Sequence, residues 1–144
     1  MPTRSAHAEW DGPIDSGSGR MAFGSGAFEG PYSFESRMQD GPGTNPEELI
    51  GAAHAGCFSM AFSLVLGNAG HPPESISTDA KVKFEQQGEG WAITGIALDT
   101  RAKVPGISEE DFQRAAEAAK ETCPVSVALK AVDISLTATL AGTP

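Results

Sequence analysis

The stretch Gly43-Thr-Asn-Pro-Glu-Glu-Leu-Ile-Gly-Ala-Ala-His-Ala-Gly-Cys-Phe-Ser-Met-Ala61 carries the strongest structural signal in the chain. It opens as a helix does: Thr44 or Asn45 can cap the helix, a proline occupies the first turn, and two glutamates lie near the positive end of the helix dipole. Residues 49–68 are apolar nearly all round, which is typical of a helix buried on every side. We therefore expect a long central helix over residues 44–69.

The chain before this helix is rich in glycine, serine and proline and contains short runs with strand character. These runs, at residues 7–10, 20–23 and 32–36, are separated by turn clusters. In the third run, apolar and polar side chains alternate as they do on a strand with one buried face. We expect residues 1–40 to form an antiparallel meander of strands.

The chain after the central helix alternates between strands and one further helix. Residues 76–104 show the period-two pattern of two strands joined by a turn at 86–90, and residues 132–140 show the pattern again. Between them, Ser108 begins a predicted helix over residues 108–123, whose apolar side chains recur at helical spacing. We expect all 144 residues to form a single α+β domain.

The charge of the chain excludes several classes of function. Its formal net charge is −9 and its isoelectric point is about 4.6. Such an acidic surface repels phosphate backbones and anionic lipids, so we expect neither a nucleic-acid partner nor a membrane partner. The sequence begins without the apolar segment of a signal peptide, and the apolar run 49–66 contains too many polar residues and glycines for a membrane span. We expect a cytoplasmic protein.

The chain has two cysteines, Cys57 and Cys123. Thiols stay reduced in the cytoplasm, so a permanent structural disulfide is not expected there. Each cysteine lies on the apolar face of a predicted helix, and Pro124 would loosen the second helix beside Cys123. Either cysteine alone could simply pack as a small apolar side chain, but the presence of both favours a reversible redox pair.

A reactive Cys57 would need a positive charge from another part of the protein. It lies about three turns into its helix, where the dipole has faded, and apolar burial raises the pKa of a thiol. Arg37 is a good source of that charge because it shortly precedes the central helix, where Glu47 could orient it. The candidate cations are Arg20, Arg37, Lys81, Lys83, Arg101, Lys103 and Lys130.

The positions of Glu47 and Cys57 constrain where a shared site could be built. They lie ten residues apart on one helix, which is roughly 15 Å along its axis. If both are catalytic, two copies of the chain must combine with their central helices antiparallel. The small residues in the first half of the helix would allow that close approach. This reasoning predicts a two-fold homodimer with two shared sites.

Other chemistry fits some of the same residues. His54 and Cys57 lie one turn apart and could form the base and nucleophile of a thiol hydrolase, although a histidine at such a position more often packs in the core. Zinc is disfavoured because His54, Cys57, His71 and Cys123 lack the spacing of a zinc site. Another alternative is a non-catalytic module whose cavity binds a hydrophobic ligand. Neither the hydrolase nor the binding module needs Cys123.

The stretch 43–61 resembles the signature helix of the OsmC branch of the OsmC/Ohr family of thiol peroxidases, and Cys123-Pro-Val-Ser126 resembles that family's second cysteine motif. The resemblance extends from Trp10 to Leu140. It implies the OsmC-like fold, in which an intertwined homodimer of α+β subunits has antiparallel sheets around a long buried central helix. It also implies a peroxidase that reduces organic hydroperoxides and hydrogen peroxide, in antioxidant defence against oxidative or osmotic stress.

The resemblance further implies a role for each site residue. Cys57 matches the peroxidatic cysteine, whose thiolate attacks the O–O bond and becomes a sulfenic acid, and Cys123 matches the resolving cysteine, which then forms a disulfide with Cys57. Arg37 matches the arginine that activates the thiolate, and Glu47 matches the glutamate that holds this arginine. A small or protein-bound dithiol would restore both thiols, with no metal, flavin or haem.

Overall fold

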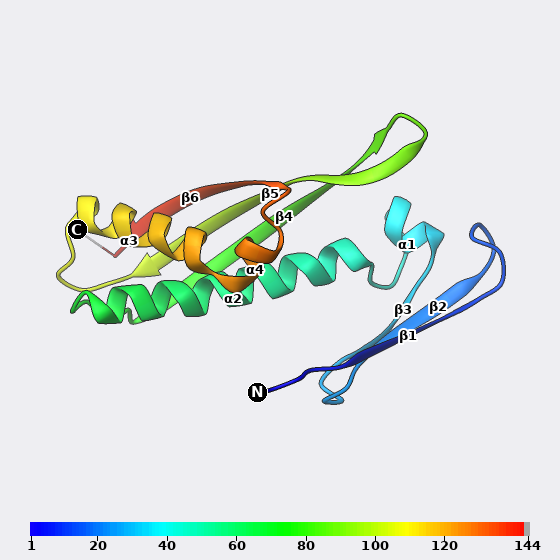
Figure 1. Ribbon diagram of the computed structural model, residues 1–144, viewed down its shortest axis with the longest axis horizontal. Coiled ribbons are helices and arrows are strands. Elements are labelled where there is room, and N and C mark those ends of the chain that lie inside the picture. Colours follow the sequence, from blue (N-terminus) through cyan, green and yellow to red (C-terminus); the bar gives the residue numbers. More distant parts are fainter. Residues whose placement is uncertain (143–144) are drawn as a thin grey trace. The chain divides into compact units, whose positions relative to one another are not determined.

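The chain folds into two compact units. The computed structural model describes residues 1–142. The first unit, Met1–Leu49, contains a three-stranded sheet and a short helix. The second unit begins at Ile50 and contains another three-stranded sheet, most of a long helix and two further helices (Figure 1).

The first unit is built on an antiparallel meander with the strand order β1-β2-β3. Trp10 in β1 pairs with Gly19 in β2, and Gly19 pairs in turn with Tyr32 in β3. The absence of a side chain at Gly19 leaves room for the rings of Trp10 and Tyr32, whose centroids are 5.4 Å apart. The elements of this unit are β1 (Ala6–Asp11), β2 (Ser18–Phe23), β3 (Glu29–Tyr32) and α1 (Phe34–Met38).

The strand expected at residues 32–36 is wrong, because β3 ends at Tyr32 and the short helix α1 follows. Ser33 and Ser36 form a capping box. Ser33 Oγ accepts a hydrogen bond from the Ser36 backbone N–H at 3.1 Å, and Ser36 Oγ accepts one from the Ser33 backbone N–H at 2.8 Å. These bonds satisfy the free donors of a helical turn and outweigh the alternation of apolar and polar residues. Arg37 therefore lies on a helix.

Helix α2 (Pro46–Asn68) occupies the place of the long helix expected over residues 44–69. Asn45 supplies the cap, because its Oδ1 accepts a hydrogen bond from the Glu48 backbone N–H at 2.7 Å. Proline in the first helical position needs no donor partner, so the start of the helix is well defined by local chemistry.

In the second unit, a mixed sheet with the order β4-β5-β6 carries the helices on one face (Figure 1). β4 and β5 form a long antiparallel hairpin, whereas β6 runs parallel to β5, which corrects the expectation of antiparallel sheets. Parallel neighbours require a crossover connection, and α3 and α4 supply it. The elements are β4 (Ser75–Gln87), β5 (Gly90–Lys103), α3 (Glu109–Thr122), α4 (Pro124–Ala128) and β6 (Asp133–Ala141).

The core of the second unit joins α2, α3 and the sheet. Phe62 of α2 lies between two other aromatic rings, with centroid distances of 5.5 Å to Phe58 and 5.4 Å to Phe112 of α3. Ile96 and Leu98, which alternate inward along β5, belong to the same buried cluster. Aromatic packing therefore fixes both helices against the sheet.

The expectation that α2 is buried on every side is not met by a single chain. The side chains of Met60 and Leu64 are 78% and 64% exposed, although both are apolar. Ala53 and Gly56 are exposed as well, and the four positions recur at helical spacing. We call this set the uncovered face of α2.

Helix α2 is long and apolar enough to cross a membrane by length and composition, with a mean hydropathy of 1.8. The expectation that residues 49–66 are too polar for a membrane span is therefore wrong as far as length and mean hydropathy are concerned. A core helix can pass the same test, and α2 packs its phenylalanines into the cluster with β5 and α3. We interpret α2 as a core helix.

Replacing Phe62 by alanine should lower the free energy of unfolding by about 3–5 kcal/mol, because the change leaves a cavity between two aromatic neighbours. Phe23 on β2, which is 40% exposed, provides the control, and Phe23→Ala should cost much less. Chemical denaturation of both variants measures the difference. Equal losses would contradict the central place of Phe62 in the core.

Candidate active site

The two cysteines meet in the second unit. Cys57 is on α2 and partly buried, whereas Cys123 follows α3 and is fully buried. Both are free thiols, and they lie close enough for each to change the pKa of the other. The fold therefore already brings together the two sulfurs that the sequence predicts to form a reversible disulfide.

Pro124 determines where Cys123 lies. The helix expected to reach Cys123 ends at Thr122, because a proline disfavours helical backbone in the residue before it. Cys123 has ψ 122°, and the chain enters a helix again in α4, with Pro124 at its first position. The resolving cysteine predicted from the sequence thus occupies a corner between two helices, and α4 was not expected.

Burial and hydrogen bonding change the pKa values of the two thiols in opposite directions. Burial raises the pKa of Cys57, and its hydrogen bond to Cys123 raises it further. Burial opposes ionisation of Cys123 as well, but hydrogen bonds from Cys57 and Ser126 outweigh it and lower the pKa of Cys123. The raised pKa of Cys57 agrees with the argument that this thiol needs a cation from elsewhere.

In the first unit, Arg37 and Glu47 form a bidentate ion pair. Arg37 Nε donates to Glu47 Oε1 at 2.8 Å, and Arg37 Nη2 donates to Glu47 Oε2 at 3.2 Å. The side chain of Glu47 is 8% exposed and that of Arg37 is 38% exposed. Two parallel bonds fix the plane of the guanidinium while part of it stays accessible.

The loop between α1 and α2 holds this ion pair in place. Ser36 Oγ donates to the Thr44 carbonyl at 2.7 Å, and Asn45 Nδ2 donates to the Ser36 carbonyl at 3.1 Å. Gly43 has φ +116°, and a Cβ there would lie 2.7 Å from the Pro31 carbonyl oxygen, so the loop requires glycine at this position. The helix that carries the arginine is therefore fixed against the start of the helix that carries the glutamate.

Arg37 also lines a pocket of 240 Å³ within the first unit. Aromatic and aliphatic side chains form most of its wall, which suits an apolar group that carries a polar end. The residues that line it are Trp10, Ile14, Tyr32, Ser33, Phe34, Arg37 and Met38.

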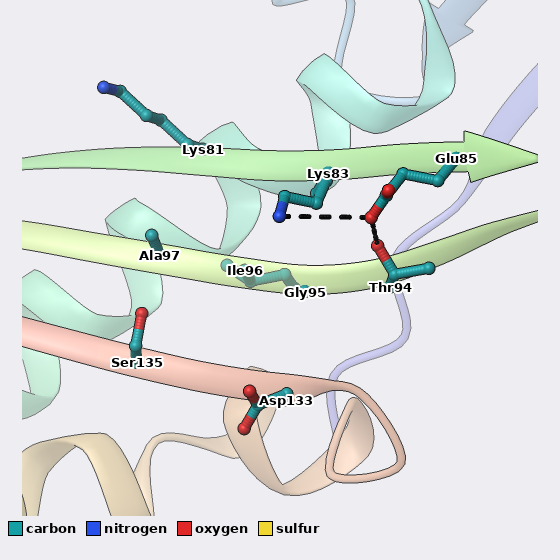
Figure 2. A pocket seen from close by; sticks show the side chains of 9 residues that line it. All are labelled: Lys81, Lys83, Glu85, Thr94, Gly95, Ile96, Ala97, Asp133 and Ser135. Atoms are coloured by element: carbon teal, nitrogen blue, oxygen red, sulfur yellow. Dashed lines mark hydrogen bonds and ion pairs between the residues drawn. The ribbon is translucent and has the colours of Figure 1, made fainter.

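Another hollow, of 360 Å³, lies on the exposed face of the second sheet (Figure 2). Lys83 Nζ points along β4 toward Glu85 Oε1, 4.0 Å away, and Thr94 donates a hydrogen bond to the same carboxylate. Lysines and acidic residues share this wall, and neither cysteine lines it. The hollow is therefore not part of the candidate site.

His54, the base of the alternative thiol hydrolase, hydrogen-bonds Ser126 rather than Cys57. Its Nε2 lies 2.7 Å from Ser126 Oγ, and both side chains are buried. Burial lowers the pKa of His54. Sequence reasoning missed Ser126, although its position three residues after Cys123 in the second cysteine motif was an available signal.

The four predicted site residues thus form two pairs, the thiols in the second unit and the ion pair in the first. Among residues 1–142, no cluster of three or more histidine, cysteine or acidic side chains could hold a metal ion. The arrangement offers a dithiol that can be oxidised and an oriented guanidinium that can stabilise negative charge.

Known proteins resemble this chain along most of its length. Residues 39–137 match the family of OsmC-like proteins. The chain is 49% identical to peroxiredoxin OsmC of Escherichia coli (strain K12) over 129 residues, which cover 89% of this chain and 90% of that protein. It is 35% identical to the organic hydroperoxide resistance protein of Xanthomonas axonopodis pv. citri (strain 306) over 99 residues, or 67% of this chain and 68% of that protein.

The fold is also similar to solved structures. The crystal structure of an organic hydroperoxide resistance protein OsmC from Legionella pneumophila superposes with a TM-score of 0.76. The match covers 96% of this chain and 99% of that chain at 24% sequence identity. The α+β fold with two sheets is therefore one that these proteins share.

The free energy of unfolding should fall as the pH is lowered from about 8 to about 5, in part through His54. Burial lowers the pKa of His54 in the folded protein below 6.5, so the unfolded chain binds a proton that the folded chain does not, and acid favours unfolding. His54→Gln should therefore make this pH dependence shallower. Urea titrations at several pH values measure the slopes, and equal slopes in the wild type and His54→Gln would exclude this role of His54.

Proposed function

Because the chain belongs to the family of OsmC-like proteins, we propose that it is a thiol peroxidase that reduces organic hydroperoxides through Cys57 and Cys123. The observation that carries the proposal is that the two free thiols lie close enough for each to change the pKa of the other, as a cysteine-pair mechanism requires. Relatives named peroxiredoxin OsmC and organic hydroperoxide resistance protein support it. The reaction takes place in the cytoplasm, where dithiol reductants are available.

The reaction has three steps. The Cys57 thiolate attacks the O–O bond, takes the terminal oxygen as a sulfenic acid and releases an alcohol. Cys123 then attacks the Cys57 sulfur, which gives a disulfide and water before a further peroxide can oxidise the sulfenic acid irreversibly. A dithiol reductant restores both thiols by exchange.

The first step depends on a positive charge beside Cys57. Burial raises the pKa of this thiol, so Arg37 must supply the charge that favours the thiolate and the developing negative charge of the leaving oxygen. Glu47 holds the guanidinium in a fixed plane through two hydrogen bonds. Arg37 and Glu47 thus act as one unit in activation.

The site is shared between two copies of the chain. Glu47 holds Arg37 at the first turn of α2, and Cys57 lies ten residues later on the same helix, roughly 15 Å along the axis. A guanidinium must come much closer than this to affect a thiol. A second chain, packed with its α2 antiparallel against the uncovered face of α2, would bring its own Arg37 to this Cys57.

The pocket beside Arg37 favours an organic substrate. Its wall is largely aromatic and aliphatic, so an alkyl or aryl group would gain free energy by leaving water, whereas hydrogen peroxide has no such group. Arg37 lines the same pocket and can bind the peroxide oxygen at its polar end. We expect both peroxides to react, the organic one faster.

Intact mass measured after one equivalent of an organic hydroperoxide tests the proposed function. The wild-type protein should lose two hydrogens as the disulfide forms, and Cys123→Ser should gain one oxygen because its sulfenic acid cannot be resolved. Cys57→Ser provides the control and should keep its mass. Unchanged masses in the wild type and in Cys123→Ser would reject the peroxidase.

Co-expression of Arg37→Ala and Cys57→Ser chains tests the shared site. Each variant alone should be impaired, Arg37→Ala by about 100-fold, because a fixed donor to the developing charge is lost. In a mixed dimer, purified through two different tags, the intact Arg37 of one chain faces the intact Cys57 of the other, so activity should return.

The double variant Arg37→Ala/Cys57→Ser paired with a wild-type chain is the matched control for this experiment. This control dimer contains the same number of substitutions as the first mixed dimer. Its intact Arg37 and its intact Cys57 are in the same chain, so neither faces an intact partner in the other chain. Activity in the control and none in the first mixed dimer would show that Arg37 and Cys57 act within one chain.

A further inference from the structure

His54 and Ser126 form a buried polar pair that the three-step mechanism does not use. His54 is wholly buried on α2 and Ser126 is 6% exposed on α4, and a 2.7 Å hydrogen bond joins them. Buried polar groups are usually fully hydrogen-bonded, whereas Nδ1 of His54 has no hydrogen-bond partner among residues 1–142, so this pair calls for an explanation. The pair lies next to Cys123, which suggests where that role is.

The position of Ser126 in α4 brings its hydroxyl to the Cys123 sulfur. Cys123 is the capping residue of α4 and Ser126 is the third residue of the helix, the position from which a side chain reaches back to the cap. Ser126 thus lies in the first turn of α4, directly after the Cys123 cap, and its hydroxyl and backbone N–H lower the pKa of Cys123. The fold therefore places Ser126 beside one of the two reacting sulfurs.

The single proton of the Ser126 hydroxyl determines the state of His54. When Ser126 donates this proton to the Cys123 sulfur, its oxygen must accept a hydrogen bond from His54, so Nε2 carries the ring hydrogen. Within residues 1–142, Nδ1 has no hydrogen-bond partner, so a second proton would create a buried N–H without an acceptor. His54 is therefore a neutral donor. A serine hydrolase is disfavoured as well, because no carboxylate of residues 1–142 orients the ring through Nδ1.

We propose that Ser126 stabilises the thiolate of Cys123 during disulfide formation, and that His54 is a positioning residue that keeps the Ser126 hydroxyl directed at that sulfur. The inference rests on the proposed peroxidase function, since it concerns the second step of that reaction. The arrangement leaves the first step, at Cys57, to Arg37.

The proposed step balances without a further reactant. The Cys123 thiolate attacks the sulfur of the Cys57 sulfenic acid, the S–S bond forms and the S–O bond breaks. The departing hydroxide takes up the proton that Cys123 released and leaves as water, so Cys123 is oxidised and the Cys57 sulfur is reduced. The same stabilisation makes Cys123 the better leaving group when a dithiol later attacks the disulfide at Cys57.

Two measurements on Ser126→Ala test the proposal. Rapid mixing with an organic hydroperoxide, followed by acid quench and intact mass, gives separate rates for sulfenic acid formation and disulfide formation. Ser126→Ala should slow disulfide formation about tenfold at neutral pH, because a hydrogen bond to a charged acceptor contributes about that factor. Sulfenic acid should accumulate, and its rate of formation should be unchanged.

The second measurement does not need a peroxide. Thiolate absorbance in a Cys57→Ser background titrates Cys123 alone, and adding Ser126→Ala should raise the pKa of Cys123. His54→Leu should act in the same direction as Ser126→Ala in both measurements. Ser126→Thr keeps the hydroxyl and His54→Gln keeps an N–H donor, so these conservative variants should restore most of the effect.

Thr100→Val is the matched structural control, because it removes a buried hydroxyl that hydrogen-bonds Thr78 at 2.9 Å elsewhere in the same unit. It should destabilise the fold without changing the rate of disulfide formation. The proposal is overturned if Ser126→Ala titrates and resolves like the wild type, or if Thr100→Val slows resolution equally. A wild-type protein that forms no disulfide would reject the peroxidase instead, while the titration would still report on Ser126.

Discussion

Burial of the Cys57 thiol on α2 raises its pKa and makes it a weak nucleophile at neutral pH. A positive charge must offset this penalty, and the arginine best placed by the sequence is tied to Glu47 at the start of the same helix. Glu47 and Cys57 lie ten residues apart on α2, roughly 15 Å along its axis, so the proposed site would need two chains. The uncovered face of α2 offers the surface through which these two chains would meet.

In the proposed reaction Cys123 has the opposite requirement, because it would have to attack quickly once Cys57 has been oxidised. Pro124 ends α3 and starts α4, so the sulfur lies at a corner where backbone N–H groups and the Ser126 hydroxyl favour its thiolate. The two thiols lie close together but in different electrostatic surroundings.

Local chemistry explains which elements could be predicted. The cap at Asn45 and the proline after it located the start of α2, and period-two alternation located β4, β5 and β6. The strand predicted at residues 32–36 was wrong. Apolar and polar side chains alternate there, but Ser33 and Ser36 lie three residues apart and form the capping box of a helix instead. The sequence correctly showed that α2 is apolar nearly all round, but the uncovered face of α2 is exposed in a single chain.

The sequence by itself located the long helix, the second helix and most of the strands, and it led to the interpretation of Cys57 and Cys123 as a redox pair with Arg37 and Glu47 as candidate partners, because caps, periodicity and motifs act over a few residues. Only the tertiary structure decided that β6 runs parallel to β5 and that His54 pairs with Ser126, which lies 72 positions away. Strand direction and long-range hydrogen bonds depend on how the crossover α3–α4 packs. Periodicity carries no information about that packing, since either strand direction presents the same alternating face.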